Sequence, residues 1–494
     1  MNLVNQLEIH AREQPSRVAI IEKNRQITFG ELWKRVRGGA EQLQQFGLKK
    51  GDAILVIHPI QIELYEVLLS AFHNGIVVVL LDPAKGAGFL DECLEWFPVQ
   101  AYFGSAKAHL LRLKSRKLRK VQAHFHSGSW LPLTIAWKPS RETSQVESLA
   151  PDAPALVTFT SGSTGKPKGV VRSHGFLLAQ DQALGASLKL QPGQIDLVTL
   201  PVFLLTNLSH GITSVIADTD LTRPGSPDCR GIQRQVCDFN VTRGTASPAF
   251  FENLPDSVLV RLSQIFTGGA PVFLDLLDRF NHLGIDATVV YGSTEAEPIS
   301  HFGAHELTER HRQKTLAGGG LPVGVPVPEI HLRIIEDQKG APISNLTRTE
   351  FDNLRREVGE IVVSGDHVLS GYLSGRGDEE TKFSVDGTIW HRTGDAGRIA
   401  GDGCLWLLGR VHAKWRDLYP LQIEAAVRVL KPGWRCAFYQ GLLIVEEAPA
   451  DLEDALPWAE GLSIVQVEKI PMDQRHNAKV DYPRLEILLK GGRC

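Results

Sequence analysis

Residues 155–169 read Ala-Leu-Val-Thr-Phe-Thr-Ser-Gly-Ser-Thr-Gly-Lys-Pro-Lys-Gly, an apolar, strand-like segment that runs into small and hydroxylated residues. Glycines let a backbone fold closely around an anion with its N–H groups pointing inward, while hydroxyls and lysines add donors and positive charge. The run differs from a Walker A loop because Pro167, rather than Ser or Thr, follows Gly165 and Lys166. A flexible Gly/Ser linker is the alternative, but such linkers rarely follow a buried strand directly. We therefore predict a loop that binds the phosphates of a nucleotide.

Further segments of similar composition follow in order along the chain. They are Gly268-Gly269-Ala270-Pro271, Tyr291-Gly292-Ser293-Thr294-Glu295, Gly359-Glu360-Ile361-Val362-Val363, Thr393-Gly394-Asp395 and Gly409-Arg410, with Lys479 close to the C-terminus. Each segment is a weak signal by itself. Their order resembles that of the adenylate-forming superfamily, which contains acyl-CoA synthetases, peptide-synthetase adenylation domains and luciferases. The resemblance extends from about residue 27 to about residue 485.

The resemblance implies a set of ATP-binding residues drawn from these segments. They are Thr160, Ser161, Gly162, Ser163, Thr164, Gly165, Lys168, Gly269, Ala270, Tyr291, Gly292, Ser293, Thr294, Asp395 and Arg410. In this family the tyrosine stacks on adenine, the aspartate holds the ribose hydroxyls and the arginine lies at the junction of two domains.

The resemblance also implies three catalytic residues, Lys479, Glu295 and Thr164. Adenylation joins a carboxylate to the α-phosphate of ATP and releases pyrophosphate, so positive charge and oriented donors supply most of the catalysis. Lys479 would bridge the two anions, and Glu295 and Thr164 offer the hard oxygen ligands that Mg²⁺ prefers. Taken alone, Glu295 would be interpreted as a carboxylate at a helix N-terminus and Lys479 as a surface lysine. The order of the motifs favours the functional roles.

The fold class predicted for this chain is α/β, with a small additional domain. Helical spacing covers residues 3–13 and 29–46, and the apolar runs 53–57 and 76–81 are typical of buried parallel strands between helices. We expect a large adenylate-forming domain, 1–410, with doubly wound sheets and a β subdomain over residues 331–408. A mobile α+β domain, 411–494, would carry Lys479.

Composition excludes several functional classes. The chain has 494 residues and a formal net charge of −3, which gives no support for nucleic-acid binding. Its six cysteines form no zinc-type spacing, and the polar N-terminus does not resemble a signal peptide, so we expect a cytoplasmic protein with reduced thiols. No transmembrane segment is predicted. The locally basic residues 107–120 are interpreted as a solvated helix face, with an anion-binding or membrane-surface patch as the alternative.

Three segments depart from the pattern of the thioester-forming ligases. His412 stands near the hinge position, and Trp415 stands about where those ligases carry a glycine that lets a pantetheine arm pass. Residues 200–205 read Leu-Pro-Val-Phe-Leu-Leu, an apolar wall that suits an aliphatic acyl group. We therefore predict that Trp415 obstructs a thiol channel.

The chain resembles one subfamily, the olefin-pathway β-lactone synthetases, most closely in residues 470–479, with further likeness in residues 81–83, 107–109, 215–224 and 389–395. This resemblance implies that a 3-hydroxy fatty acid is adenylated and then closed to a β-lactone by its own hydroxyl, which gains from proximity. Either His412 or His476 could assist deprotonation, although structural roles are favoured for both. The alternatives are a fatty acyl-CoA or acyl-carrier-protein ligase and a catalytically silent nucleotide-binding partner protein. Other enzymes of a fatty-acid-derived pathway are possible partners.

Overall fold

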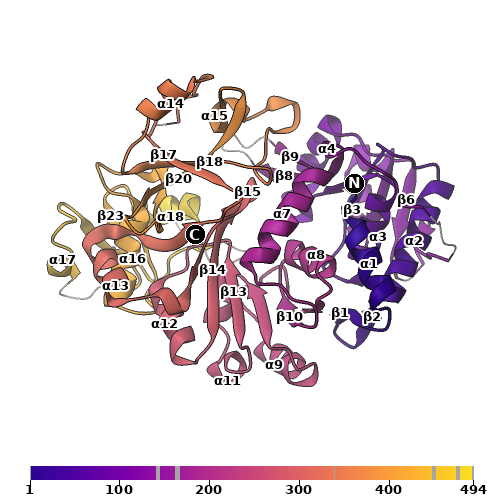
Figure 1. Ribbon diagram of the computed structural model, residues 1–494, viewed down its shortest axis with the longest axis horizontal. Helices are drawn as coiled ribbons and strands as arrows, with labels where there is room; N and C mark the ends of the chain where they lie inside the picture. The colour runs from indigo at the N-terminus through magenta and orange to yellow at the C-terminus, as the bar shows by residue number, and fades with distance from the viewer. Residues whose placement is uncertain are drawn as a thin grey trace. The chain divides into compact units, whose positions relative to one another are not determined.

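The computed structural model describes residues 2–128, 130–140, 145–161, 167–338, 340–447, 452–473 and 479–491 (Figure 1). The chain divides into two compact units. The first consists of Met1–Ile216 and Leu369–Asp378, and the second of Ala217–Val368 and Glu379–Cys494. The predicted α/β class is confirmed. The predicted boundary after residue 410 lies inside the second unit, and a separate mobile domain from residue 411 stays a prediction.

A seven-stranded sheet dominates the first unit, in the order β7-β6-β5-β3-β4-β8-β9. Its strands are β3 (Ala53–Ile57), β4 (Val77–Leu80), β5 (Ala101–Gly104), β6 (Ala123–His126), β7 (Ile135–Ala136), β8 (Pro154–Ser161) and β9 (Pro167–Ser173). Neighbours pair in parallel except β8 and β9, which form an antiparallel hairpin. Every residue of β3 is buried, as expected for a parallel strand covered on both faces.

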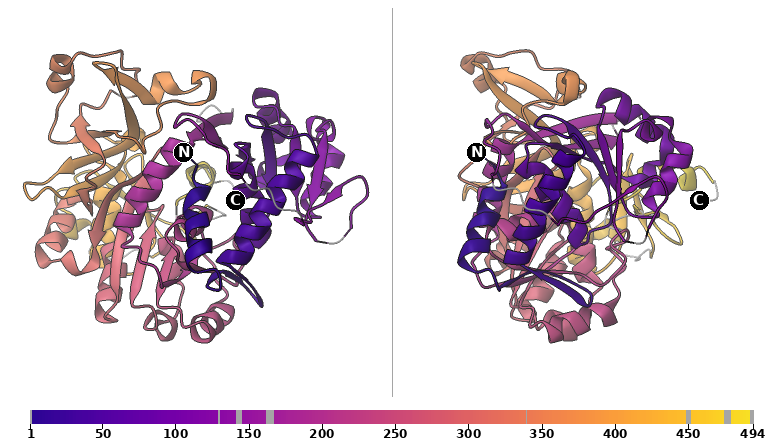
Figure 2. Two further views of the ribbon diagram at one scale, coloured as in Figure 1. Left: turned by 45° about the vertical axis from the view of Figure 1, so that its right-hand side comes forward. Right: turned by 90° about the vertical axis from the view of Figure 1, so that its right-hand side faces the viewer.

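The same unit contains a second group of strands in the order β10-β11-β1-β2, together with eight α-helices. The strands are β1 (Val18–Glu22), β2 (Arg25–Thr28), β10 (Ile195–Val198) and β11 (Thr213–Ile216). The helices are α1 (Val4–Glu13), α2 (Phe29–Gln45), α3 (Ile62–His73), α4 (Gly86–Trp96), α5 (Leu111–Lys114), α6 (Arg116–Arg119), α7 (His174–Ser187) and α8 (Pro201–Ser209). Helices α1, α2 and α3 pack side by side (Figure 2). Helix α2 begins at the predicted residue because Thr28 and Glu31 form a capping box.

The second unit begins with three parallel strands, β12 (Arg243–Ala246), β13 (Gln264–Gly268) and β14 (Asp286–Ser293). Antiparallel strands continue from β14, in the order β15-β16-β21-β20-β18-β17, with β19 beside β20. Their bounds are β15 (Ala296–Gly303), β16 (Leu321–Pro326), β17 (His331–Ile335), β18 (Gly359–Ser364), β19 (Lys382–Val385), β20 (Thr388–Ile399) and β21 (Leu405–Arg410). Helix α9 (Cys229–Asp238) precedes these strands, and the helices between them are α10 (Pro248–Glu252), α11 (Asp256–Leu259), α12 (Leu274–His282), α13 (Glu309–Lys314), α14 (Arg348–Asn353) and α15 (Asp378–Thr381). Within the predicted β subdomain, 331–408, the structure places the antiparallel strands β17, β18, β19, β20 and β21, while Leu369–Asp378 belongs to the first unit.

The C-terminal part of this unit is a small α+β assembly, as predicted. It contains α16 (Pro420–Leu430), α17 (Leu452–Ala455), α18 (Tyr482–Leu489) and a three-stranded sheet of β22 (Cys436–Tyr439), β23 (Leu442–Val445) and β24 (Ser463–Gln466). Its core packs Ile423 and Val427 of α16 against Phe438 and Leu443.

Contacts from α16 tie this assembly to the rest of the second unit. The Arg428 guanidinium lies 2.7 Å from Asp275 Oδ2 and 3.0 Å from Glu252 Oε1, and it is nearly buried. The Gln422 amide donates to the Gly318 carbonyl at 2.7 Å. Removing one partner of a buried ion pair leaves an unpaired charge in the interior, which is strongly destabilising. These contacts therefore hold the assembly in place.

No helix among the described residues is long and apolar enough to cross a membrane. The described cysteines, which are Cys93, Cys229, Cys237, Cys404 and Cys436, are all free thiols. Cys494 lies outside the described residues.

Glu424 is a buried carboxyl on α16 that accepts a hydrogen bond from the Phe438 backbone N–H at 2.8 Å. Burial raises the pKa of Glu424 from 4.5 to about 7, and the hydrogen bond offsets only part of this effect. A raised carboxyl pKa means that the folded chain holds this proton more tightly than the unfolded chain does. The stability that this group contributes is therefore complete below pH 4.5 and is lost as the pH rises through about 7.

We predict that Glu424→Gln is more stable than the wild type at pH 8, where the buried charge costs the wild type roughly 3 kcal/mol at most. Between pH 5 and pH 8 the wild type should lose the stability that protonated Glu424 contributes, so its melting temperature should fall. The variant has no ionisable group at this position, so its melting temperature should change little. Thermal unfolding across this pH range measures the difference. The exposed Glu460→Gln serves as the control and should follow the wild type. Equal pH dependence in Glu424→Gln and wild type would contradict the assignment.

Candidate active site

The predicted adenine segment follows β13 at the edge where the parallel strands β12, β13 and β14 end. Gly268 lies in register with Val290 of β14, and a Cβ at Gly268 would stand 2.3 Å from the Val290 carbonyl oxygen. Gly269 has φ +80°, a conformation that residues with a side chain rarely adopt. Nothing lies within 4 Å of the position that its Cβ would occupy. The two glycines therefore leave an open backbone surface against which a flat base can pack.

Tyr291, Asp395 and Arg410 come together although they lie far apart in the sequence. The Tyr291 hydroxyl donates to Asp395 Oδ2 at 2.8 Å. The Arg410 guanidinium lies 3.2 Å from Asp395 Oδ1 and donates to the Thr393 carbonyl at 3.2 Å. Asp395 and Arg410 face each other across the pairing of β20 with β21. The structure thus unites the predicted adenine, ribose and junction residues.

Burial raises the pKa of both Asp395 and Tyr291. For Asp395, the charge of Arg410 and the hydrogen bond from Tyr291 offset only part of this rise. Burial and the neighbouring Asp395 charge hold the pKa of Tyr291 well above its usual value, so its hydroxyl stays a donor. A carboxylate held in this way is well suited to accept charge-assisted hydrogen bonds from two ribose hydroxyls.

Lys479 lies close enough for its charge to act on Asp395. Its backbone N–H donates to Asp473 Oδ1 and its carbonyl accepts from the Asp473 N–H, both at 2.8 Å, which fixes the backbone at this point. Partial desolvation and the charge of Arg410 lower the pKa of Lys479, while Asp395 and Asp473 raise it. The residue as a whole is exposed, although its ammonium group is partly desolvated.

Glu295 lies in the tight turn between β14 and β15, where Ser293 pairs with Ala296. The turn is close-packed, since a Cβ at Gly292 would stand 2.8 Å from the Ala296 carbonyl oxygen. The described residues contain no group of three or more His, Cys, Asp and Glu side chains that could hold a metal ion. Mg²⁺ often takes only one or two carboxylates and completes its shell with phosphates and water. The half-buried Glu295 fits that mode, in which the bound nucleotide would supply the remaining ligands.

The predicted phosphate loop joins β8 to β9 in the first unit. Ser161 pairs with Pro167, and Thr160 pairs with Lys168. The loop residues Gly162, Ser163, Thr164 and Gly165 lie outside the described residues, so their predicted roles remain untested. The Lys168 ammonium lies 6.0 Å from the centre of the Tyr372 ring. The predicted Lys168 therefore lies beside the Tyr372 ring where β9 begins.

Comparison with known proteins agrees with this geometry. Residues 7–373 match the model of the family described as AMP-binding enzyme. The chain belongs to this family. It is 31% identical to the olefin beta-lactone synthetase of Xanthomonas campestris, over 98% of this chain and 97% of that protein. It is 29% identical to the olefin beta-lactone synthetase of Stenotrophomonas maltophilia, with the same coverage.

Among solved structures, the anthranilate CoA ligase AuaEII in complex with anthranoyl-AMP superposes with a TM-score of 0.78. It is 15% identical and covers 99% of this chain and 97% of its own, so it supports the fold alone. As a member of the AMP-binding family, this chain is an AMP-forming ligase that activates an acid as its adenylate.

A buried ion pair explains why a glutamate belongs to the 359–363 motif of this AMP-binding enzyme. Arg392 donates to Glu360 Oε2 through Nη2 at 2.6 Å and through Nε at 2.9 Å, and both side chains are almost fully buried. The Thr393 hydroxyl donates to the Ile361 carbonyl at 2.9 Å. These bonds join β18 to β20 immediately before Asp395. The pair therefore fixes the strand that carries Asp395, a role that the sequence did not reveal for Arg392.

Ser247 is a candidate site residue that sequence reasoning missed. It follows Ala246 at the end of β12, level with Gly268 of β13, and it is 4% exposed. It occupies the N-cap position of α10, yet its side chain caps nothing, and its Oγ has no hydrogen-bond partner among the described residues. A buried hydroxyl without a partner is costly, which makes it a candidate to bind a polar ligand group. A serine before a proline gives no sequence signal for this role.

Trp415 and His412 follow β21 in the second unit, where the sequence suggested a blocked thiol channel and a hinge. The Trp415 indole packs on Phe438, with ring centres 6.1 Å apart, and over Gly441, where a Cβ would stand 2.6 Å from the ring. Packing alone accounts for this indole, and obstruction of a thiol channel stays a prediction. His412 is exposed in a turn after Arg410, and desolvation together with the Arg410 charge lowers its pKa. His476 lies outside the described residues.

The predicted apolar wall at residues 200–205 lies in the first unit and forms the start of α8. Leu204 is fully buried there, while Val202 and Leu205 are half-buried and remain partly accessible.

We predict that Asp395→Asn weakens AMP binding about 10- to 100-fold. The amide keeps the shape of the side chain but loses the charge that strengthens its bonds to ribose hydroxyls. Titration calorimetry with AMP measures the change. Asp417→Asn, at a fully exposed side chain of the same unit, should bind AMP like the wild type. Unchanged affinity in Asp395→Asn would remove this residue from the ribose site.

Proposed function

We propose that this enzyme activates a 3-hydroxy fatty acid with ATP and then closes the acyl adenylate to a β-lactone. In the first step a carboxylate oxygen bonds to the α-phosphorus of ATP and pyrophosphate leaves. In the second step the 3-hydroxyl oxygen bonds to the acyl carbon, AMP leaves, and the hydroxyl proton passes to a base or to solvent. The observation that carries this proposal is the similarity over nearly the whole chain to two olefin beta-lactone synthetases.

The described residues of the second unit support the adenylation step. Lys479 would draw the carboxylate and the α-phosphate together, and Tyr291 with Asp395 would hold the nucleoside portion in place. Glu295 and Thr164 would hold Mg²⁺, which screens the phosphate charges when it is bound. Ring closure needs no second substrate, because the attacking hydroxyl belongs to the bound molecule and is already close to the acyl carbon.

A fatty acyl-CoA or acyl-carrier-protein ligase is the alternative function, because such an enzyme begins with the same adenylation step. In that case a thiol would capture the acyl adenylate in place of the hydroxyl. The two functions share every residue of the adenylation step, so the nature of the acceptor separates them. The substrate in either case is proposed to be an aliphatic carboxylic acid, which suits the apolar residues at the start of α8.

The deciding experiment measures AMP release over many turnovers without CoA, using a 3-hydroxy fatty acid and its unsubstituted analogue. We expect sustained release with the hydroxy acid only, because only that substrate contains its own acceptor. Lys479→Ala is the negative control and should lower pyrophosphate release about 100-fold, as expected when a group that stabilises transition-state charge is removed. Release that stops after one adenylate and resumes on addition of CoA would replace the lactone proposal with a thioester ligase.

Ser247→Ala tests whether the buried hydroxyl at the end of β12 binds the substrate hydroxyl. We expect kcat/KM for the 3-hydroxy acid to fall roughly threefold to tenfold, the value of one neutral hydrogen bond. Adenylation of the unsubstituted acid should be unchanged, because it has no group for Ser247 to bind. The exposed Ser263→Ala is the matched control. An equal loss with both acids would mean that Ser247 acts through folding alone.

A further inference from the structure

The residues 107–120 of the first unit form a strongly cationic segment. They contain seven lysines and arginines and no acidic residue, in a chain whose net charge is −3. The cations are Lys107, Arg112, Lys114, Arg116, Lys117, Arg119 and Lys120. The neighbouring helix α4 has fewer acidic side chains than this segment has cations. One of them, Glu95, lies 3.8 Å from the Lys117 ammonium. The segment thus keeps an excess of positive charge.

Large apolar side chains stand exposed among and beside these cations. Leu110 is 60% exposed and Leu113 is 76% exposed. Trp130 and Leu133, on the connection between β6 and β7, are 80% and 88% exposed. Monomeric proteins seldom gather large apolar side chains in this way without a binding role.

The two groups lie at the same edge of the seven-stranded sheet. The 3₁₀ helix η2 (Ala108–Leu110) follows β5, and Trp130 follows β6. Strands β5 and β6 pair in parallel, so their carboxyl ends lie together. A hydrogen bond of 2.9 Å from His109 Nε2 to the Phe125 carbonyl ties η2 directly to β6. We call the seven cations with Leu110, Leu113, Trp130 and Leu133 the basic apolar surface.

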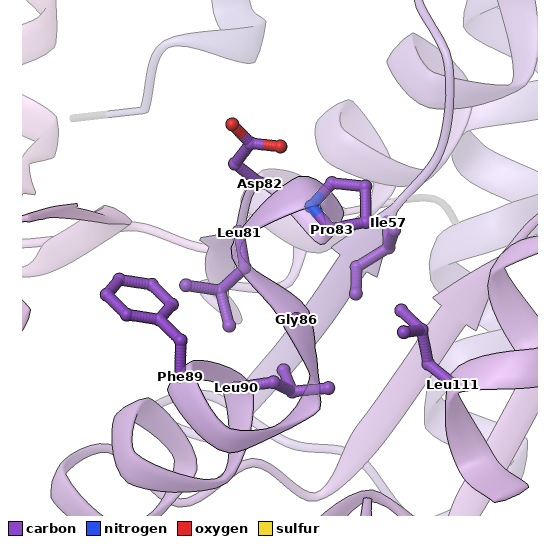
Figure 3. A pocket seen from close by; sticks show the side chains of 8 residues that line it. All are labelled: Ile57, Leu81, Asp82, Pro83, Gly86, Phe89, Leu90 and Leu111. Carbon is purple, nitrogen blue, oxygen red and sulfur yellow. The ribbon is translucent and has the colours of Figure 1, made fainter. Parts of the chain in front are cut away.

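The segment under this surface is firmly anchored, so its exposed leucines are held outward by the fold. Leu118 is fully buried. The Leu111 side chain lines a small apolar pocket together with Leu81 and Leu90, as Figure 3 shows. Asp91 of α4 accepts hydrogen bonds from the Ser115 hydroxyl and from the backbone N–H groups that begin α6. A platform built in this way can present apolar side chains without losing its structure.

We propose that the basic apolar surface docks this protein on an anionic lipid bilayer. Leu110, Leu113, Trp130 and Leu133 enter the headgroup region, and the lysines and arginines lie over the lipid phosphates. Tryptophan is enriched at this depth because its ring is amphipathic. An acidic protein would satisfy the cations, but it would not by itself explain four exposed apolar side chains that project among them. This docking needs no membrane-spanning helix, and it stands independently of which acyl acceptor the enzyme uses.

The test is sedimentation of the full chain with vesicles of phosphatidylcholine alone or with about one third phosphatidylserine. We expect binding to the anionic vesicles only, and release by high salt because the attraction between charges is screened. The double variant Leu110→Ser/Leu113→Ser should bind at least about tenfold more weakly. Each of Lys114→Gln and Lys117→Gln should weaken binding about fivefold.

The matched control is Val260→Ser/Ile487→Ser, which removes two exposed apolar side chains from the second unit and should bind like the wild type. All variants are first checked for an unchanged melting temperature and AMP affinity. Absence of wild-type binding to either vesicle would overturn the proposal. Unchanged vesicle binding by the Leu110→Ser/Leu113→Ser variant would also overturn it, because binding would then depend on charge alone. Tight binding to an acidic protein without vesicle binding would assign the surface to a protein partner instead.

Discussion

The Asp395 carboxylate, held between Tyr291 and Arg410, is the interaction on which the rest of the site depends. Removing a carboxylate from water favours its protonated form, and a protonated acid would bind two ribose hydroxyls poorly. One hydrogen bond and the nearby positive charges oppose this effect. Partial burial, and then the charge of the same Arg410, lower the ammonium pKa of Lys479, while Asp395 opposes this effect, so the two candidate site residues influence each other electrostatically.

Backbone constraints explain why glycines recur around this group. Gly268 and Gly292 lie where a Cβ would overlap a carbonyl oxygen of the neighbouring strand. Gly409 has φ +130°, and a Cβ there would stand 2.9 Å from the Pro420 ring. It therefore allows β21 to end directly beside the start of α16. Arg410, the next residue, reaches Asp395 only because this close approach is possible.

The position of Lys479 depends on contacts made far from it. Arg428 on α16 bonds Asp275 and Glu252, and the Trp458 indole donates to the Leu316 carbonyl at 2.7 Å. These bonds join the C-terminal α+β assembly to the remainder of the second unit. The assembly that carries Lys479 is thus held by buried ionic and polar contacts on its other elements. A thioester ligase needs a thiol path as well, whereas closure by the substrate's own hydroxyl does not.

The sequence by itself determined the α/β class, the order of the nucleotide-binding segments and most residues of the candidate site. These follow from local chemistry: apolar runs form buried strands, glycines mark close backbone approaches, and Asp395, Tyr291 and Lys479 each belong to a short motif. Only the tertiary structure decided that Arg392 of β20 pairs with Glu360 of β18 beside Asp395, that Trp415 packs on Gly441, and that the Ser247 hydroxyl is buried without a partner among the described residues. It also decided which leucines of a basic segment are buried and which face outward. Such outcomes depend on pairing between residues distant in the chain, and no local pattern of charge or hydrophobicity encodes the register that brings them together.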